Sequence, residues 1–128
     1  MPPRSATEYF LQNCYVGASQ PTPADVRAGL DVVGIDRFMW GSDYPHEEGT
    51  HPFTTESLRQ TMSGLDRDTV QRMLAGTAAD LYGFDLDKLR PLAQQVGPRV
   101  DEVALPLDQL PADANQALKR SHEQLVGA

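Results

Sequence analysis

Residues 35–46 carry the clearest structural signal in this chain, and they read Ile35-Asp36-Arg37-Phe38-Met39-Trp40-Gly41-Ser42-Asp43-Tyr44-Pro45-His46. The part from Ile35 to Gly41 predicts a β-strand with an apolar centre that does not alternate with polar residues. Such a strand is typical of a parallel sheet that helices cover on both faces. Gly41 and Pro45 then predict a turn and a stiff exit, which place Asp43 just past the end of the strand.

The residues before this strand complete a strand-helix-strand pattern. A first strand is predicted over residues 14–16, and a helix follows between the capping box of Thr22 and Asp25 and the glycine at position 34. Pro23 occupies the first helical position, where its missing N–H costs little. Strand, helix and parallel strand within about 30 residues form a βαβ unit.

The rest of the chain is predicted to be mainly helical. Helices are expected over residues 6–12, 55–63, 68–75, 77–82 and 112–126, and from residue 86 onward, where Pro91 interrupts or restarts the helix. The expected caps are a capping box of Ser5 and Glu8 for the first helix, Asp66 for residues 68–75, and Thr77 with Asp80 at capping spacing for residues 77–82. Residues 97–111 hold three prolines and scattered acids, so an extended surface arm is expected there. The predicted organisation is residues 1–98, followed by an acidic arm and terminal helix over residues 99–128.

Two predicted parallel strands are too few for a stable sheet. A two-stranded ribbon is marginal by itself, and parallel strands occur almost only within larger covered sheets. We therefore expect the chain to be the C-terminal part of a larger α/β protein, incomplete as a lone chain, or to complete its sheet with other material.

Charge and composition exclude several classes of protein. The 128 residues include 18 acidic and 11 basic side chains, for a formal charge of −7. An acidic chain does not suit the phosphate backbone of nucleic acid. No apolar run approaches the ~20 residues of a membrane span, and the first residues do not resemble a signal peptide. Cys14 is the single cysteine, so no internal disulfide is expected, and a cytoplasmic location is the predicted one.

Asp43 is the main candidate for chemistry. Ligands of α/β proteins bind at the carboxyl ends of parallel strands, which is where this residue is predicted to lie. A carboxylate in that position can ligate a divalent metal, accept a proton from metal-bound water, or do both. The structural alternative, in which Asp43 caps the loop or the next helix, is equally compatible with the spacing.

The other polar residues of this region fit ordinary structural roles when they are considered one by one. His46 and His51 are five residues apart, which does not match the i, i+4 pair of helical metalloproteases, so each is expected to be a loop histidine. Glu47 and Glu48 are expected to be solvated loop carboxylates. His122 is predicted to lie on a polar terminal helix without a functional role.

The stretch from Phe38 to His46 strongly resembles the last barrel strand of the amidohydrolase-related (amidohydrolase 2) family, in its branch of aminocarboxymuconate-semialdehyde decarboxylase and related aromatic-acid decarboxylases. Three more stretches are similar to that family: residues 8–17 to the seventh helix-to-strand passage, 49–53 to the loop after the metal aspartate, and 75–85 to the closing helix. The resemblance covers about residues 5–98. Thr77 stands where the family often has asparagine.

The resemblance implies a (β/α)8 TIM barrel, of which this chain holds strands seven and eight with the surrounding helices. It implies that Asp43 ligates a divalent metal, most commonly Zn²⁺, and accepts a proton from its water. His46 matches a loop position beside the site and is expected to contact a small-molecule substrate. Hydrolysis and decarboxylation of a carbonyl- or carboxylate-bearing substrate are both compatible with this scaffold.

The family's remaining metal ligands are histidines on strands one, five and six, and they have no counterpart among the three histidines of this sequence. A whole barrel takes about 250 residues. We therefore expect the chain alone to be inactive, and its partners to be a complementing N-terminal half or further copies of itself. The alternatives are a non-catalytic helical interaction module and a truncated reading frame without independent activity.

Overall fold

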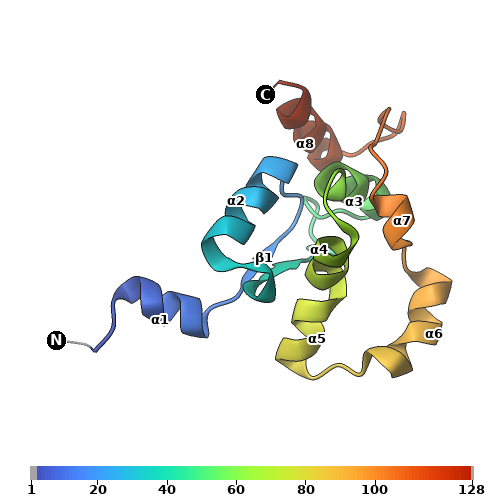
Figure 1. Cartoon of the computed structure of the whole chain (residues 1–128). Helices are drawn as coiled ribbons and strands as arrows, with labels where there is room; N and C mark the ends of the chain where they lie inside the picture. The colour runs from blue at the N-terminus through green and yellow to red at the C-terminus, as the bar shows by residue number, and fades with distance from the viewer. Residues whose placement is uncertain (1–2, 128) are drawn as a thin grey trace.

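The structure is a computed structural model, and it describes residues 3–127 (Figure 1). Two short parallel strands lie among helices, with the elements in the order α1 (Ala6–Asn13), β1 (Val16–Ala18), α2 (Pro23–Val33), η1 (Ile35–Arg37), β2 (Phe38–Trp40), α3 (Thr54–Met62), α4 (Arg67–Gln71), η2 (Arg72–Gly76), α5 (Thr77–Tyr82), α6 (Leu86–Val96), α7 (Val100–Val103) and α8 (Gln116–Val126). No helix within these residues is long and apolar enough to cross a membrane.

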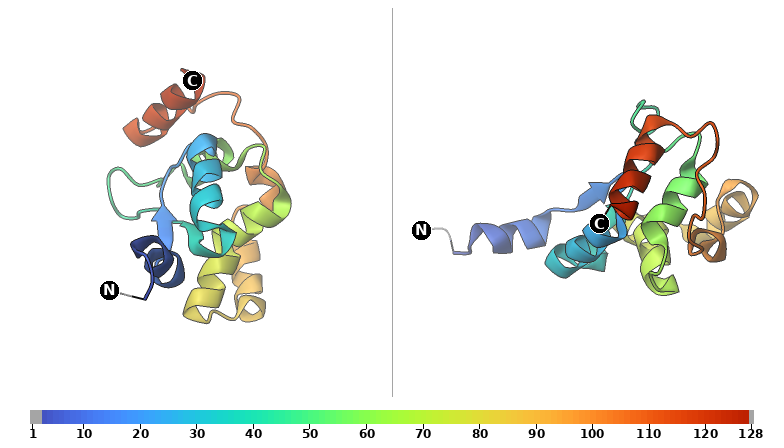
Figure 2. Two further views of the ribbon diagram at one scale, coloured as in Figure 1. Left: turned by 60° about the vertical axis from the view of Figure 1, so that its left-hand side comes forward. Right: turned by 90° about the horizontal axis from the view of Figure 1, so that it is seen from above.

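The starts of α1 and α2 confirm both predicted capping boxes. Ser5 accepts a hydrogen bond from the backbone of Glu8, whose side chain in turn accepts from the backbone of Ser5. Thr22 and Asp25 exchange the same two bonds, and Pro23 is the first residue of α2. Each box satisfies N–H groups that the first helical turn leaves without an intrahelical partner. Figure 2 shows α1 projecting away from the other helices.

Both strands differ in extent from the prediction. The first is β1, over residues 16–18 rather than 14–16, because the backbone N–H of Cys14 already donates to Phe10 O and closes the end of α1. The second was expected over residues 35–41, but residues 35–37 form the 3₁₀ turn η1, in which the N–H of Arg37 donates to Gly34 O. A parallel ladder then joins only three residue pairs, Val16 to Phe38, Gly17 to Met39 and Ala18 to Trp40.

The segment from Arg67 to Tyr82 also differs from the prediction. Two helices were expected, but α4, the single π-turn η2 and α5 follow one another without a break. Thr77 is therefore not a helix cap: it has αR dihedral angles inside this helical segment, and its hydroxyl donates to Ile35 O at 2.7 Å. The segment ends at Gly83, whose φ of 72° is left-handed. Pro91 lies inside α6 and does not interrupt it.

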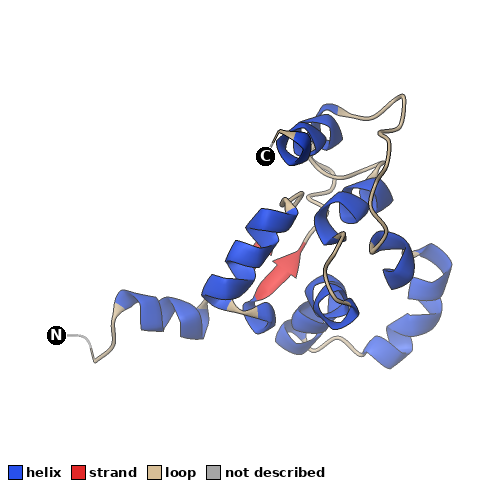
Figure 3. Cartoon of the chain, turned by 45° about the horizontal axis from the view of Figure 1, so that its top comes forward, coloured by secondary structure: helices blue, strands red, loops and turns tan. Residues whose placement is uncertain are grey.

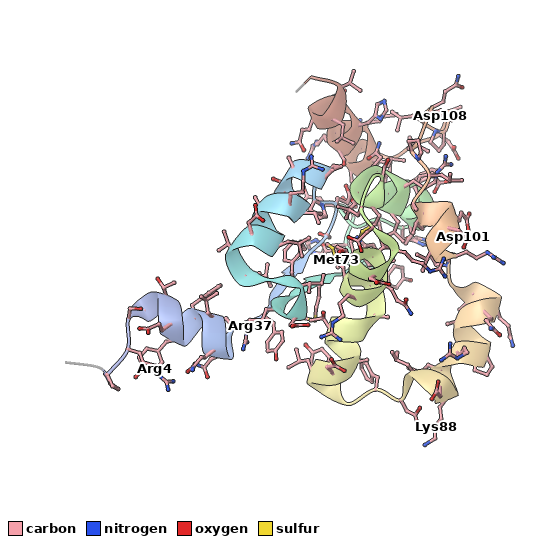
Figure 4. All side chains as sticks on the ribbon, viewed as in Figure 1. Arg4, Arg37, Met73, Lys88, Asp101 and Asp108 are labelled. Carbon is pink, nitrogen blue, oxygen red and sulfur yellow. The ribbon has the colours of Figure 1, made fainter. Side chains whose placement is uncertain are left out.

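The core lies between α2, β2 and the helices that follow. It contains Val26 from α2, Phe38 from β2, Leu58 and Met62 from α3, Val70 and Met73 from the segment 67–76, and Val103 from α7. Figure 4 shows Met73 near the centre of the molecule. Helix α2 contacts β2, and so does the π-turn η2. Figure 3 shows the short strands enclosed among these helices.

Residues 97–111 are not extended throughout, as had been expected. Helix α7 forms within this segment, and Val103 is fully buried in the core. Arg59 of α3 holds the following residues, because its guanidinium donates to Leu105 O at 3.2 Å and to Pro106 O. The terminal helix α8 begins at Gln116, later than predicted, with Asn115 as its cap. The side chain of Leu118 on this helix is fully buried.

Candidate functional site

Asp43 lies in the loop that leaves the carboxyl end of β2. The N–H of Gly41 donates to Ala18 O at 3.1 Å, so the backbone stays beside β1 for one residue beyond β2. Asp43 follows with a φ of 55°, in the left-handed region. Few non-glycine residues adopt this region, and aspartate and asparagine are among those that tolerate it best. The predicted position of Asp43 past the strand end is therefore confirmed, and its backbone conformation is an unusual one.

Backbone hydrogen bonds close the loop around Asp43. The N–H of His46 donates to Asp43 O, the N–H of Gly49 to His46 O and the N–H of Thr50 to Ser42 O, each at 2.9 Å. Gly49 is buried, and a Cβ added there would lie 2.7 Å from Asp43 O. The loop thus needs glycine at position 49, and Thr50, fully buried, anchors its return.

The structure brings His46 beside Asp43. The His46 Nδ1 lies 3.6 Å from the Asp43 Oδ2, and the two side chains are 74% and 48% exposed. Solvent screens such an exposed pair, so it contributes little to stability. Both side chains are accessible to a ligand at the carboxyl end of the strands.

The other two histidines lie elsewhere. The ring of His51 packs edge-on against Tyr44, with 5.3 Å between the ring centroids, and its carbonyl accepts a long hydrogen bond from Asn115. His122 lies on α8, where its Nδ1 is 3.1 Å from the amide nitrogen of Gln60. Both histidines therefore have structural contacts in this chain, His51 in a loop and His122 on the terminal helix.

Asp43 lines a hollow of about 240 Å³ that the sequence did not predict. Its walls come from the loop after β1, the loop after β2 and helix α8, through Ser19, Gln20, Asp43, Glu48, Ala117, Arg120, Ser121 and Gln124. Gln20 has a φ of 52°, so this hollow contains both of the non-glycine residues that have a positive φ within residues 3–127. Left-handed backbone outside glycine is costly, and such residues cluster at active sites and ligand-binding regions.

Helix α8 also contributes the basic group of this hollow. Arg120 lies 3.8 Å from the carboxylate of Glu48, and the backbone carbonyl of Glu48 accepts a hydrogen bond from Gln20 at 3.1 Å. These contacts join the two strand-end loops and α8. The sequence did not place residues 112–126 beside Asp43, because the pattern of a polar helix does not indicate which loop it will contact.

The residues of this chain do not fit a complete zinc site. Structural and catalytic zinc sites use four or three protein ligands. Within residues 3–127 no group of three histidine, cysteine or acidic side chains converges as a metal site would require. Asp43 and His46 come together as a pair only.

Comparison with protein families supplies the remaining evidence. A family model described as Amidohydrolase matches residues 11–84, which is more than half of the chain. The match begins within α1, includes both strands and the loop of Asp43, and ends just after α5, so α6, α7 and α8 lie outside it. No solved structure matches the chain. The parallel strand pair, the position of Asp43 and the extent of the family match together show that this chain belongs to the amidohydrolase family.

Proposed function

We propose that this chain supplies the C-terminal part of a (β/α)8 amidohydrolase barrel, in which Asp43 is one ligand of a divalent metal, with zinc as the expected ion. The observation that carries the proposal is the left-handed backbone of Asp43 at the carboxyl end of β2, inside the region that matches the family. This is the edge of a parallel sheet where barrel enzymes mount their catalytic groups. The complete barrel would hydrolyse or decarboxylate a small substrate bearing a carbonyl or carboxylate group.

The small sheet supports the proposal that further strands complete the fold. Strands β1 and β2 pair only with each other, so each leaves one edge without a partner within residues 3–127. Parallel strands are normally found in larger sheets, and closure into a barrel removes both edges. Further strands would also bring the ligands that Asp43 lacks here.

His46 has a secondary place in the proposal. Its ring lies beside Asp43 and is mostly exposed, so it can contact a substrate that approaches the carboxylate. The basic group of Arg120 faces the same hollow from α8.

Metal content in a complemented barrel tests the role of Asp43. The chain would be co-expressed with a polypeptide that carries the missing strands and histidines, and the zinc content and turnover of the purified complex measured. Asp43→Asn keeps a residue that tolerates a positive φ but removes the charge, so it should weaken zinc binding about tenfold or more and abolish turnover. Glu47→Gln, a change in an exposed carboxylate of the same loop that does not line the hollow, is the control. Equal zinc content and turnover in wild type and Asp43→Asn would refute the proposal.

A second candidate function is a non-catalytic module that binds another protein or a second copy of the chain. It is favoured by α6, whose Leu86, Leu89, Leu92 and Val96 are 42%, 42%, 56% and 77% exposed. Clustered apolar side chains of this kind mark interaction surfaces. Light scattering over a concentration series tests binding to a second copy, because a monomer at all concentrations argues against self-association through this face.

A further inference from the structure

A second hollow, of about 620 Å³, lies among α4, α6 and α7. It shares no residue with the hollow beside Asp43. Its walls are the start of α4, the second half of α6 and the link that leads into α7. In Figure 1, α6 runs along the side of the molecule and continues into α7, which lies near α4. Figure 4 labels Asp101, one of the lining residues, on α7.

The charge of this hollow is opposite to that of the chain. Three arginines, Arg67, Arg90 and Arg99, line it together with a single carboxylate, that of Asp101. The whole chain, in contrast, has 18 acidic and 11 basic residues. The arginines come from three different parts of the fold, so tertiary structure gathers them at one place.

The guanidinium groups of the three arginines are available to a ligand. Arg67 makes no hydrogen bond or ion pair to any other side chain within residues 3–127. Arg90 pairs at 2.6 Å with Asp87, which does not line the hollow, and Arg99 pairs at 3.1 Å with Asp101. All four of these paired side chains are more than half exposed. Exposed ion pairs contribute about 0–1 kcal/mol, so a ligand with a stronger charge can replace them.

We propose that this hollow binds a small multivalent oxyanion through Arg67, Arg90 and Arg99. The planar guanidinium presents paired N–H donors that match the oxygens of phosphate and carboxylate groups. Phosphate esters and polycarboxylates share this chemistry. A long nucleic acid is a poorer fit, because the chain as a whole is acidic, with a formal charge of −7, and would repel its backbone. This site does not depend on the role proposed for Asp43, and each can fail without the other.

Titration of the full chain with inorganic pyrophosphate and with citrate tests the proposal. Binding would be followed by calorimetry and by amide NMR shifts at about 20 mM NaCl, where screening is weak. At least one of the two probes should bind and shift the backbone amide signals of Gly97 and residues 99–101. A preference for pyrophosphate assigns a phosphate ligand, and a preference for citrate assigns a polycarboxylate. If neither pyrophosphate nor citrate binds at millimolar concentration, the proposal is overturned.

Charge variants then locate the bound anion. Arg67→Gln and Arg90→Gln should each weaken binding about tenfold, since each removes a charge-assisted contact. Arg27→Gln is the control, because Arg27 is also an exposed helical arginine but lies on α2 and does not line the hollow, and it should change affinity less than twofold. Asp87→Asn frees Arg90 from its ion pair and should strengthen binding. Equal losses in Arg27→Gln and the two hollow variants would show nonspecific attraction and refute the site.

Discussion

The conformation of Asp43 depends on one small residue six positions later. Gly49 fits against the carbonyl oxygens of Ser42, Asp43 and His46, which lie 2.9, 2.7 and 2.9 Å from the position of a Cβ. Those oxygens belong to the backbone, and all three accept the hydrogen bonds that close the loop. They cannot move away from a new methyl group without opening the loop, so the left-handed backbone of Asp43 and the glycine at position 49 belong to one arrangement.

Gly49→Ala should therefore disturb the site and reduce stability. We expect a loss of about 1–3 kcal/mol in the free energy of unfolding, the usual cost of overpacking a close contact. Urea unfolding measures this loss, and amide shifts of residues 42–50 report the change in the loop. Gly41→Ala is the control, because a Cβ at that position meets nothing within 4 Å and position 41 has no positive φ. Its effect should stay within about 1 kcal/mol of zero; an equal loss in both variants would contradict the role of Gly49.

Among the elements, the π-turn η2 explains why Thr77 does not cap a helix, although its spacing to Asp80 predicts a cap. Thr77 and Asp80 have the spacing of a capping box, but α4 continues through η2 into α5, and the backbone of Thr77 is helical. Its hydroxyl instead bonds the carbonyl of Ile35, in the turn η1 just before β2. Thr77 therefore ties the helical segment to the start of the strand that leads to Asp43.

Thr77→Val tests this contact with little change in shape. The side chain is 1% exposed, so losing the hydroxyl leaves the Ile35 carbonyl without its partner. We expect the free energy of unfolding to fall by about 1–3 kcal/mol, as measured by chemical denaturation. Thr55→Val, on α3, is the comparison, and its hydroxyl has no hydrogen bond among those found within residues 3–127. A helix-capping role would instead predict that Thr77→Asn retains full stability.

The start of α2 should make stability depend on pH. Asp25 accepts hydrogen bonds from the side chain of Thr22 at 2.7 Å and from its backbone at 2.9 Å, and these bonds lower the pKa of Asp25 from its ordinary 3.8. A lowered folded-state pKa stabilises the protein above pH 3.8, and that contribution is lost as the pH falls through the folded-state value.

Asp25→Asn should therefore destabilise the protein more at neutral pH than at acidic pH. The difference in unfolding free energy between wild type and variant, measured by urea titration at several pH values, should shrink as the pH falls below 3.8. Asp31→Asn, at an exposed position of the same helix, controls for the change in net charge. A difference that does not vary with pH would show that the capping bonds of Asp25 do not depend on its ionisation.

At the scale of the whole molecule, the residues after position 98 take part in the main core. Val103 is fully buried in the same cluster as Phe38 and Met73, and Leu118 of α8 is fully buried as well. Helix α3 contacts both α7 and α8. This packing favours a single cooperative unit, whereas the division into residues 1–98 and 99–128 remains a prediction about domain organisation.

Val103→Ala distinguishes the two descriptions. If residues 99–127 belong to the core, the variant should lower the stability of the whole chain by about 2–3 kcal/mol, through lost burial and the cavity left behind. The change should appear equally in far-UV circular dichroism and in the fluorescence of Trp40, which lies in β2. Leu105→Ala, at a position that is 57% exposed, should have little effect. A separate transition seen by circular dichroism, with Trp40 unaffected, would support two domains instead.

The local features of this protein could be predicted from its sequence because their interactions span only a few residues. The capping boxes at Ser5 and Thr22, the cap at Asp66, and the position of Asp43 after a strand are features of this kind. The resemblance to amidohydrolases was also visible in short stretches, and the family match over residues 11–84 supports it at the level of the family.

Tertiary structure determined the features that join distant parts of the chain. The limits of β1 and β2 depend on which residues meet in the ladder, and Thr77 bonds a carbonyl 42 positions away. The hollow beside Asp43 needs α8, and the three arginines of the second hollow come from α4, α6 and the start of α7. A polar helix or a surface arginine has many compatible neighbours, and only the packing of the core determines which one it meets.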